Sequence, residues 1–215
     1  MKVYSKNQLQ RYPIYLKFFK KLLNEGVTTV SSPMIAKDLG YSEEQIRKDL
    51  QAVCDTPGRP KKGRDVRKVI DTLESFLGYH DKVNAVILGA GKLGSALARY
   101  PGFGEMGLRI VAAFDVDPAK YGEEDGITVY PIEKLDAVLK ETNCRIAIIT
   151  VPPHEAQAAA DLAVKHGIRG LWNFAPTLLT VPDDIILENV NLASSLAVLS
   201  HNLNRRLAIE EKFDY

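Results

Sequence analysis

The pattern of apolar and polar positions changes in kind near residue 83. Before it, apolar residues recur every three or four positions, most clearly over residues 12–24, which is the spacing of one buried helix face. After it, continuous apolar runs such as residues 83–88 alternate with stretches of helical spacing. Such alternation is typical of a mostly parallel sheet covered by helices. The chain is therefore predicted to join a helical N-terminal module to an α/β module.

The first 30 residues predict helical segments with recognisable ends. Ser5 and Gln8 have the spacing of a capping box, and Pro13 stands where a second segment can begin. The helix over residues 12–24 is expected to bury its apolar face in a core and to end at Gly26.

Two short helices joined by a glycine then predict a helix-turn-helix. The first begins at Ser32-Pro33 and ends at Gly40, and the second begins at the capping pair Ser42 and Gln45. The second helix of this motif enters the major groove with its N-terminal half toward the bases. Polar and basic side chains are expected to contact DNA here, namely Ser31, Ser32, Gln45, Arg47 and Lys48.

Residues 55–65, DTPGRPKKGRD, are rich in proline, glycine and basic residues. They predict a β-wing whose basic side chains reach the DNA backbone or minor groove, with a solvated basic loop as the alternative. The candidate residues are Arg59, Lys61, Lys62 and Arg64. An amphipathic helix over residues 66–77, ended by Gly78, is expected to close the module.

A glycine-rich turn follows the apolar run at 83–88. It reads Gly89, Ala90, Gly91, Lys92, Leu93 and Gly94. Gly89 is expected to make the turn, Gly91 to let the backbone approach a pyrophosphate, and Gly94 to pack the next helix closely on the strand. A second apolar run ends in Asp115, roughly 20 residues further on, whose carboxylate would accept from ribose hydroxyls and repel a 2′-phosphate. This favours NAD(H) over NADP(H).

The remaining pattern completes the sheet. Strands are predicted near residues 128–130, 146–151, 170–174 and 185–188, and helices over 132–140 and 154–165. In such sheets, ligands bind at the carboxyl ends of the strands. The expected cofactor contacts there are Thr150, Val151, Pro152, Asn173 and Phe174, although these could instead be plain strand-end turns.

One long helix is predicted from Asn191 to the end of the chain. Its leucines lie on a single stripe, with the spacing of a helix that packs on another helix: Leu192, Leu196, Leu199, Leu203 and Leu207. Docking on its own sheet is the alternative. A homodimer is favoured, because a helix-turn-helix protein usually reads two half-sites.

Composition excludes several classes of protein. With 46% hydrophobic and 26% charged residues, the chain is expected to fold. It has no apolar run of about 18 residues and no signal-peptide pattern, so a cytoplasmic protein without a membrane segment is expected. Cys54 and Cys144 are far apart and the histidines are scattered, which predicts neither a metal site nor a disulfide framework.

The net charge is divided unevenly along the chain. Residues 1–82 carry 16 Lys and Arg against 10 Asp and Glu, a net charge of +6, and the remainder carries −5. A basic first third suits a module that binds a polyanion such as DNA.

Several motifs in a fixed order carry a resemblance to a known family. They are VSS and QIRKDL, then GAGKLGSALARYPGFGE and AAFDVDPAK, then ITVP, GLWNFAPTLLTVP and ENVNL. Over nearly its whole length the chain resembles the Rex family of redox-sensing transcriptional repressors.

The resemblance implies an α/β protein of three parts. A winged helix-turn-helix domain spans 1–80, a Rossmann-like NAD(H)-binding domain spans 81–190, and a C-terminal helix at 191–215 is exchanged within a homodimer. Tyr100 and Leu192 match positions that line or close the cofactor pocket. The implied function is not enzymatic: the repressor holds double-stranded operator DNA when NADH is scarce and releases it when NADH binds.

Three departures from the family lie at functional positions. Residues 51–54, QAVC, replace a Ser-aromatic-aromatic-Gly stretch, and the wing lacks its usual glycine-rich, aromatic sequence. Both changes lie where DNA is read and bear on the operator sequence. Lys17 and Asn191 stand where relatives commonly carry arginine and aspartate, so coupling through an ion pair there is not expected.

Two alternatives remain open from the sequence. A divergent paralogue could bind another nucleotide or coenzyme A and have altered or lost DNA specificity, although Asp115 suits a ribose diol. An NAD-dependent oxidoreductase is disfavoured, because the residues after Gly94 are used to complete the sheet. They leave no substrate domain and no evident general acid or base.

Overall fold

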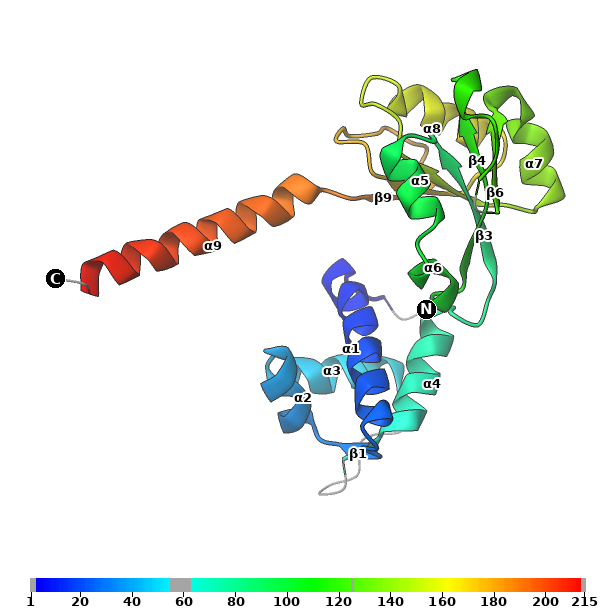
Figure 1. Cartoon of the computed structure of the whole chain (residues 1–215). Helices are drawn as coiled ribbons and strands as arrows, with labels where there is room; N and C mark the ends of the chain where they lie inside the picture. Colours follow the sequence, from blue (N-terminus) through cyan, green and yellow to red (C-terminus); the bar gives the residue numbers. More distant parts are fainter. Residues whose placement is uncertain (1–2, 55–62, 125, 214–215) are drawn as a thin grey trace. The chain divides into compact units, whose positions relative to one another are not determined.

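The computed structural model describes residues 3–54, 63–124 and 126–213, which form two compact units (Figure 1). The first unit comprises the chain up to Lys82 together with Glu105–Gly107. The second comprises Val83–Gly104 and the chain from Leu108 on. The main boundary therefore falls where the hydrophobic pattern changes, because helix spacing and buried-strand spacing build different cores.

The first unit is helical, with a small sheet. Its elements are α1 (Lys6–Asn24), β1 (Thr29–Val30), α2 (Ser32–Leu39), α3 (Glu43–Val53), β2 (Arg64–Asp65) and α4 (Val66–Leu77). The helices enclose a core whose largest fully buried side chains are Tyr12, Tyr15, Phe19, Ile35, Ile46, Leu50 and Leu73. The predicted helix-turn-helix is present as α2 and α3, joined through Gly40 in the left-handed conformation.

The helix α1 continues through Pro13, so the prediction of a second segment beginning there is wrong. The predicted Ser5 cap is present, since its Oγ accepts from the N–H of Gln8 at 3.2 Å. An interior proline costs a helix about 3 kcal/mol. Tyr12 and Phe19 lie fully buried on either side of it, and their burial offsets that cost.

The strands β1 and β2 pair antiparallel, and β2 forms the last two residues of the predicted wing, 55–65. Residues 55–62 of the wing lie outside the described residues. Gly63 has a φ of +70°, and a Cβ there would run into the carbonyl group of Val30, so only glycine fits. The closing helix α4 has the predicted bounds and ends at Gly78 in the left-handed conformation.

The second unit is built on a mostly parallel sheet. Its strands are β3 (Val83–Leu88), β4 (Leu108–Asp115), β5 (Gly122–Glu124), β6 (Ile127–Pro131), β7 (Ile146–Ile149), β8 (Gly170–Asn173) and β9 (Ile186–Asn189). They lie in the order β5-β6-β4-β3-β7-β8-β9, and of these neighbours only β5 and β6 are antiparallel. The order reverses beside β3, which confirms the predicted Rossmann-like arrangement.

Helices cover both faces of this sheet. They are α5 (Lys92–Ala98), α6 (Gly102–Glu105), the 3₁₀ turns η1 (Pro118–Lys120) and η2 (Ile132–Lys134), α7 (Leu135–Glu141) and α8 (Ala156–Lys165). Val86 and Leu88 of β3 pack with α7 and α8, whereas Ala85 and Ile87 pack on the opposite face with α5 and α6. A strand buried on both faces has no polar alternation, which explains the continuous apolar run.

The element ends differ from the sequence prediction by a few residues. The strand predicted over 146–151 ends at Ile149, and the helix predicted over 154–165 begins at Ala156. The strand β5 was not predicted, because Gly-Glu-Glu carries no apolar pattern. Thr150 and Val151, which were expected in this strand, instead follow its end and line a cavity.

The predicted terminal helix is present as α9 (Leu192–Phe213). Asn191 caps it, since its side-chain oxygen accepts from the N–H of Ser194 at 3.0 Å. None of the helices in the described part of the chain is both long and apolar enough to span a membrane.

Candidate functional site

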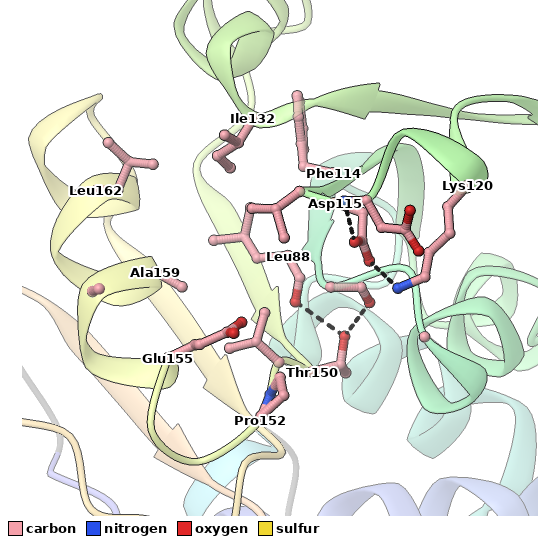
Figure 2. A pocket seen from close by; sticks show the side chains of 16 residues that line it. Leu88, Phe114, Asp115, Lys120, Ile132, Thr150, Pro152, Glu155, Ala159 and Leu162 are labelled. Carbon is pink, nitrogen blue, oxygen red and sulfur yellow. Dashed lines mark hydrogen bonds and ion pairs between the residues drawn. The ribbon is translucent and has the colours of Figure 1, made fainter.

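A cavity of about 760 Å³ lies at the carboxyl ends of β3, β4 and β7, beside the reversal of strand order (Figure 2). Its lining comprises Leu88, Gly89, Gly91, Phe114, Asp115, Val116, Asp117, Lys120, Ile132, Thr150, Val151, Pro152, Glu155, Ala158, Ala159 and Leu162. Most of these side chains are apolar, and the charged ones are Asp115, Asp117, Lys120 and Glu155. The cavity has the place and size of a nucleotide site in a doubly wound sheet.

The glycine turn packs closely against the strand ends around it. Gly89 has a φ of +100°, and a Cβ there would lie 2.9 Å from backbone atoms of Thr150 and Val151. Thr150 places its hydroxyl 2.7 Å from the carbonyl oxygen of Gly89 and 3.1 Å from that of Leu88, and donates its single proton between them. A Cβ on Gly94 would run into the carbonyl oxygen of Gly89. The predicted tasks of Gly89 and Gly94 therefore have direct structural causes.

Gly91 differs from these two glycines. It lines the cavity, and a Cβ built on it would meet no atom within 4 Å. Its φ of −75° is open to any residue. Nothing in the described protein requires glycine here, and its backbone is open toward the cavity.

Asp115, at the end of β4, binds the glycine turn. One carboxylate oxygen accepts from the N–H of Ala90 at 2.8 Å and from the ammonium of Lys120 at 2.9 Å. The other accepts from the N–H of Asp117 at 2.9 Å. Burial alone would raise the pKa of Asp115, but these hydrogen bonds and the Lys120 charge hold it below its usual value. Asp115 is therefore ionised at neutral pH and fixed in the wall of the cavity.

The wall of the cavity carries more negative than positive charge. Asp115, Asp117 and Glu155 contribute three carboxylates against the ammonium of Lys120. The Lys120 side chain is 39% exposed and pairs with Asp115, which raises its pKa. A ligand with a ribose diol suits this wall better than one with a further phosphate on the ribose.

Some residues predicted to contact a cofactor lie in the cavity wall and others do not. The wall includes Gly89, Gly91, Asp115, Thr150, Val151 and Pro152, whereas Ala90, Lys92, Leu93, Gly94, Tyr100, Asn173, Phe174 and Leu192 lie outside it. Ala90 and Gly94 shape the turn from within. Lys92 and Leu93 are exposed at the start of α5, and Leu192 is 71% exposed at the start of α9.

Asn173 is 1% exposed, and its amide is used inside the protein. Its nitrogen donates to the carbonyl of Thr177 at 2.9 Å and to Asn189 at 2.8 Å, and its oxygen accepts from the N–H of Ala175 at 2.9 Å. These bonds fix the turn after β8. Both N–H donors are occupied, so Asn173 offers no free donor to a ligand.

An aromatic row lies on the opposite face of the sheet from α8. Tyr100 is 50% exposed, and its ring packs edge-on against Phe103 with 5.0 Å between the ring centroids. The centroid of the Trp172 ring lies 5.6 Å from that of Phe103 and 4.9 Å from that of Phe174. Two of the predicted residues, Tyr100 and Phe174, therefore stand at the ends of this row rather than in the cavity.

Sequence reasoning missed several residues of the cavity wall. Asp117 and Lys120 lie within the motif AAFDVDPAK, two and five residues after Asp115, but the spacing from the glycine turn points only to Asp115. Ile132, Glu155 and Leu162 belong to segments predicted only as helices. The order of the strands brings these residues together, and their spacing along the chain does not predict it.

The residues predicted to contact DNA differ in exposure and in the partners they have within the protein. Arg47 and Lys48 are exposed on α3, and the ammonium of Lys48 lies 2.7 Å from the carboxylate of Glu44. Ser31 caps α2 by position only, because its hydroxyl makes no capping bond. Ser32 is half-buried in the first turn of α2, and Arg64 is half-buried in β2. The predicted contacts Arg59, Lys61 and Lys62 lie outside the described residues.

A buried carboxylate joins α3 to α1. Asp49 is 1% exposed and accepts from Nε and Nη2 of Arg11, at 2.6 and 2.9 Å, and from the hydroxyl of Tyr15 at 2.8 Å. The hydrogen bond to Asp49 raises the pKa of Arg11, and burial raises the pKa of Tyr15. Burial also raises the pKa of Tyr12, to about 12, and its hydroxyl donates to the carbonyl of Asp49 at 3.1 Å.

Ser42 caps α3, but only half of the predicted capping box forms. Its hydroxyl accepts from the N–H of Gln45 at 3.2 Å. The Gln45 side chain does not turn back to Ser42. It donates forward to Asp49 at 2.9 Å.

Neither cysteine is exposed, and burial raises the pKa of Cys144. Within the described residues, His, Cys, Asp and Glu side chains form no cluster of three that could hold a metal ion.

Two protein families match parts of the chain. The family described as putative DNA-binding protein N-terminus matches residues 5–51, and the CoA binding domain family matches residues 80–177. The two matches fall on the helix-turn-helix and on the sheet with its cavity.

Curated relatives cover nearly the whole chain. The redox-sensing transcriptional repressor Rex of Carboxydothermus hydrogenoformans is 42% identical over 92% of this chain and 95% of its own length. The protein of the same name from Desulforamulus reducens is 43% identical over 95% of each chain.

Solved structures of the same family are also similar to this chain. The crystal structure of RSP, a Rex-family repressor, superposes with a TM-score of 0.88 at 32% identity and covers 98% of this chain and 99% of that one. Structures of RSP in complex with β-NAD+ and operator DNA, and in complex with β-NADH, superpose with the same TM-score of 0.88.

Proposed function

The chain belongs to the Rex family of redox-sensing transcriptional repressors, and from this premise we infer that its first unit binds operator DNA under the control of NAD(H) bound in its second unit. Its relatives are named as transcriptional repressors, so the chain is a regulator and not an enzyme. The observation that carries the inference is Gly91, a glycine that lines the cavity and that no atom of the described residues requires, in the same chain as a helix-turn-helix.

The cavity favours NAD(H) over coenzyme A as its ligand. Coenzyme A would bring a phosphate on its ribose toward the carboxylates of Asp115, Asp117 and Glu155, with Lys120 as the one ammonium in the wall. NAD(H) brings a ribose diol, which donates hydrogen bonds to carboxylates. The domain family named for coenzyme A thus describes the fold of this unit rather than its ligand.

The cofactor contacts are assigned from this cavity. Gly89, Gly91 and the turn residues around them would cradle the pyrophosphate, and Asp115 would receive the adenosine ribose. Thr150, Val151 and Pro152 would lie beyond the pyrophosphate, toward the nicotinamide. Tyr100, Phe174 and Leu192 would act at that end only through closure around the ring, whereas Asn173 would only hold the turn after β8.

A closed apolar pocket around the nicotinamide would distinguish the two redox states. The oxidised nicotinamide carries a positive charge and the reduced ring carries none, so loss of water penalises NAD+ more than NADH. If NADH favours a closed state whose helix-turn-helix motifs no longer fit DNA, then DNA must weaken NADH binding by the same factor.

The DNA-binding residues are assigned on the exposed side of the helix-turn-helix and at the wing. Arg47 and Lys48 would meet phosphates or guanine edges, and Ser31 and Ser32 would contact phosphate at the start of α2. Arg59, Lys61, Lys62 and Arg64 would bind the backbone beside the groove. When DNA binds, Lys48 would exchange its exposed partner Glu44 for the nucleic acid.

A homodimer is proposed from the exposed face of α9. The stripe of Leu192, Leu196, Leu199, Leu203 and Leu207 is between 46% and 71% exposed. A continuous apolar helix face of this length is unfavourable in water and suits a partner helix of a second copy. Two copies would also present two helix-turn-helix motifs, one for each half-site.

The test of the proposed function is selection of DNA from a random pool, with no cofactor, with NAD+ and with NADH. We expect enrichment of a two-fold symmetric sequence that NADH suppresses and NAD+ suppresses far less. Calorimetry of NADH, NAD+ and coenzyme A is expected to rank NADH first and coenzyme A last. Folded protein that enriches no sequence at low salt would contradict the proposal.

Replacing Lys48 by alanine is expected to weaken operator binding by roughly 10-fold, because one charged contact to a base or phosphate is worth about 1–3 kcal/mol. NADH affinity should not change, because the cofactor lies in the other unit. Titration of labelled operator at physiological salt measures the effect. Lys165→Ala, which removes the same charge from the last turn of α8, is the matched control and should bind DNA normally. Equal affinities of the two variants would remove Lys48 from the interface.

A further inference from the structure

The half-buried amide of Gln45 is fixed by a carboxylate from its own helix. Its Nε2 lies 2.9 Å from one oxygen of Asp49, and Asp49 is itself held by Arg11 and Tyr15 of α1. Gln45 and Asp49 stand four residues apart, which places them one turn apart on the same side of α3. The orientation of the Gln45 amide is thus tied to the packing of α1 on α3.

Chemistry settles which end of the amide faces Asp49. A carboxylate bound to a guanidinium accepts hydrogen bonds and has no proton to donate, so only the nitrogen end of the amide can lie against it. The carbonyl oxygen of Gln45 must then lie on the other side. It accepts no hydrogen bond from the residues that the structure describes.

The groups left over on Gln45 form a complementary pair. One N–H of the amide is used by Asp49, and one N–H and the carbonyl oxygen remain. In the major groove, adenine offers an N6 donor and an N7 acceptor side by side, and an amide in one fixed orientation can engage both. Phosphate offers only acceptors and would leave the carbonyl oxygen without a partner.

Gln45 also lies at the appropriate place on α3. It stands in the first turn, shortly before the exposed Arg47 and Lys48, and the first turns of a second helix in this motif meet base edges. An amide already fixed by folding loses little side-chain freedom when it binds.

We propose that Gln45 reads an adenine in each operator half-site and that Asp49 is a positioning residue that fixes the Gln45 amide for this task. The proposal rests on the DNA-binding function proposed above and names the base class that it recognises. Arg11 acts one step further back, because it holds both oxygens of Asp49.

The first test is selection of DNA from a random pool by the full-length chain and by Gln45→Met, which keeps the length of the side chain and removes the amide. We expect the unchanged chain to enrich adenine at one position of each half-site, about 10-fold over other bases, as one good base contact is worth about 1–3 kcal/mol. Gln45→Met should lose this one preference and retain the rest of the sequence and the salt dependence of binding. An unchanged preference in Gln45→Met would overturn the proposal. Failure of the unchanged chain to enrich any sequence would instead refute the DNA-binding function.

The role of Asp49 is tested with Asp49→Asn and Tyr15→Phe. The amide introduced by Asp49→Asn can donate to the Gln45 carbonyl, so the Gln45 amide can turn over, and the adenine preference should fall toward that of Gln45→Met. Tyr15→Phe removes a bond to the other Asp49 oxygen and should lower stability without changing the preferred base. A folded Asp49→Asn variant that still selects adenine at full strength would show that Asp49 has no positioning role.

Gln45→Glu tests whether residue 45 reads the base, even if Asp49→Asn does not fold. A glutamate is repelled by Asp49, and its carboxylate accepts from the N4 amino group of cytosine. Selection with Gln45→Glu is expected to replace adenine by cytosine at the same position. Retention of adenine by this variant would overturn the proposal.

Discussion

Gly91→Ala is expected to leave the fold intact and to weaken NADH binding by roughly 10- to 100-fold, the equivalent of about 1–3 kcal/mol of overpacking. Its backbone has an ordinary φ of −75°, and the added methyl group would meet no atom of the described chain within 4 Å. The methyl group would instead occupy cavity space that the pyrophosphate needs. Calorimetric titration with NADH measures the loss, and thermal unfolding without cofactor should show no change.

Gly94→Ala is the matched control, because it adds the same methyl group three residues away. There the methyl group would run into the carbonyl oxygen of Gly89 and lie 2.9 Å from the hydroxyl of Thr150. The turn must move, so we expect the free energy of unfolding of the cofactor-free protein to fall by about 1–3 kcal/mol. A lower unfolding temperature would show this loss. If Gly91→Ala lowered the stability as much as Gly94→Ala and left NADH affinity unchanged, Gly91 would serve the fold and not the cofactor.

The double variant Leu199→Asp and Leu203→Asp is expected to be monomeric and to lose operator binding by at least about 100-fold. These leucines are 64% and 52% exposed in the single chain, and burial of one leucine side chain is worth about 1.5–3 kcal/mol. In a dimer the substitution affects both copies, and it places charges in the contact. A monomer reads only one half-site. Sedimentation velocity measures the assembly, and titration of a two-half-site operator measures the DNA affinity.

His201→Asp is the control for this helix. It adds a charge to α9 on the side away from the leucine stripe, since residue 201 lies about half a turn from residues 199 and 203. It should remain dimeric and bind operator normally. If the leucine variant also remained dimeric, α9 would not be the dimer contact, and the stripe would have to be covered in another way.

Much of the fold could be predicted from hydrophobic spacing and end signals. The helix-turn-helix, the bounds of α4 at Val66 and Leu77, and the parallel strands around the glycine turn are confirmed. The break at Pro13 is wrong, because buried aromatic rings hold α1 together through the proline. The strand β5 was missed because its pairing with β6 depends on backbone bonds and not on an apolar pattern.

The candidate site was predicted less completely than the fold. The glycine turn, Asp115 and Thr150 could be found because each belongs to a motif or to a strand end. Lys120 and Glu155 could not, because they join the cavity only when β4 and β7 are placed on either side of β3. Asn173 stands at a strand end as predicted, yet its amide is occupied by the protein.

By itself, the sequence determined that a basic helix-turn-helix precedes a dinucleotide-binding sheet, since helix period, strand runs and glycine spacing are local properties of the chain. Only the tertiary structure decided which polar groups are free. Gln45 looks like one half of a capping box in the sequence, and Gly91 looks like its neighbour glycines. A hydrogen bond to Asp49, which Arg11 holds in turn, fixes the Gln45 amide, and the empty space beside Gly91 leaves its backbone open to a ligand. The physical reason is that hydrogen-bond partners and free volume come from segments far apart in the chain, and no pattern of neighbouring residues records them.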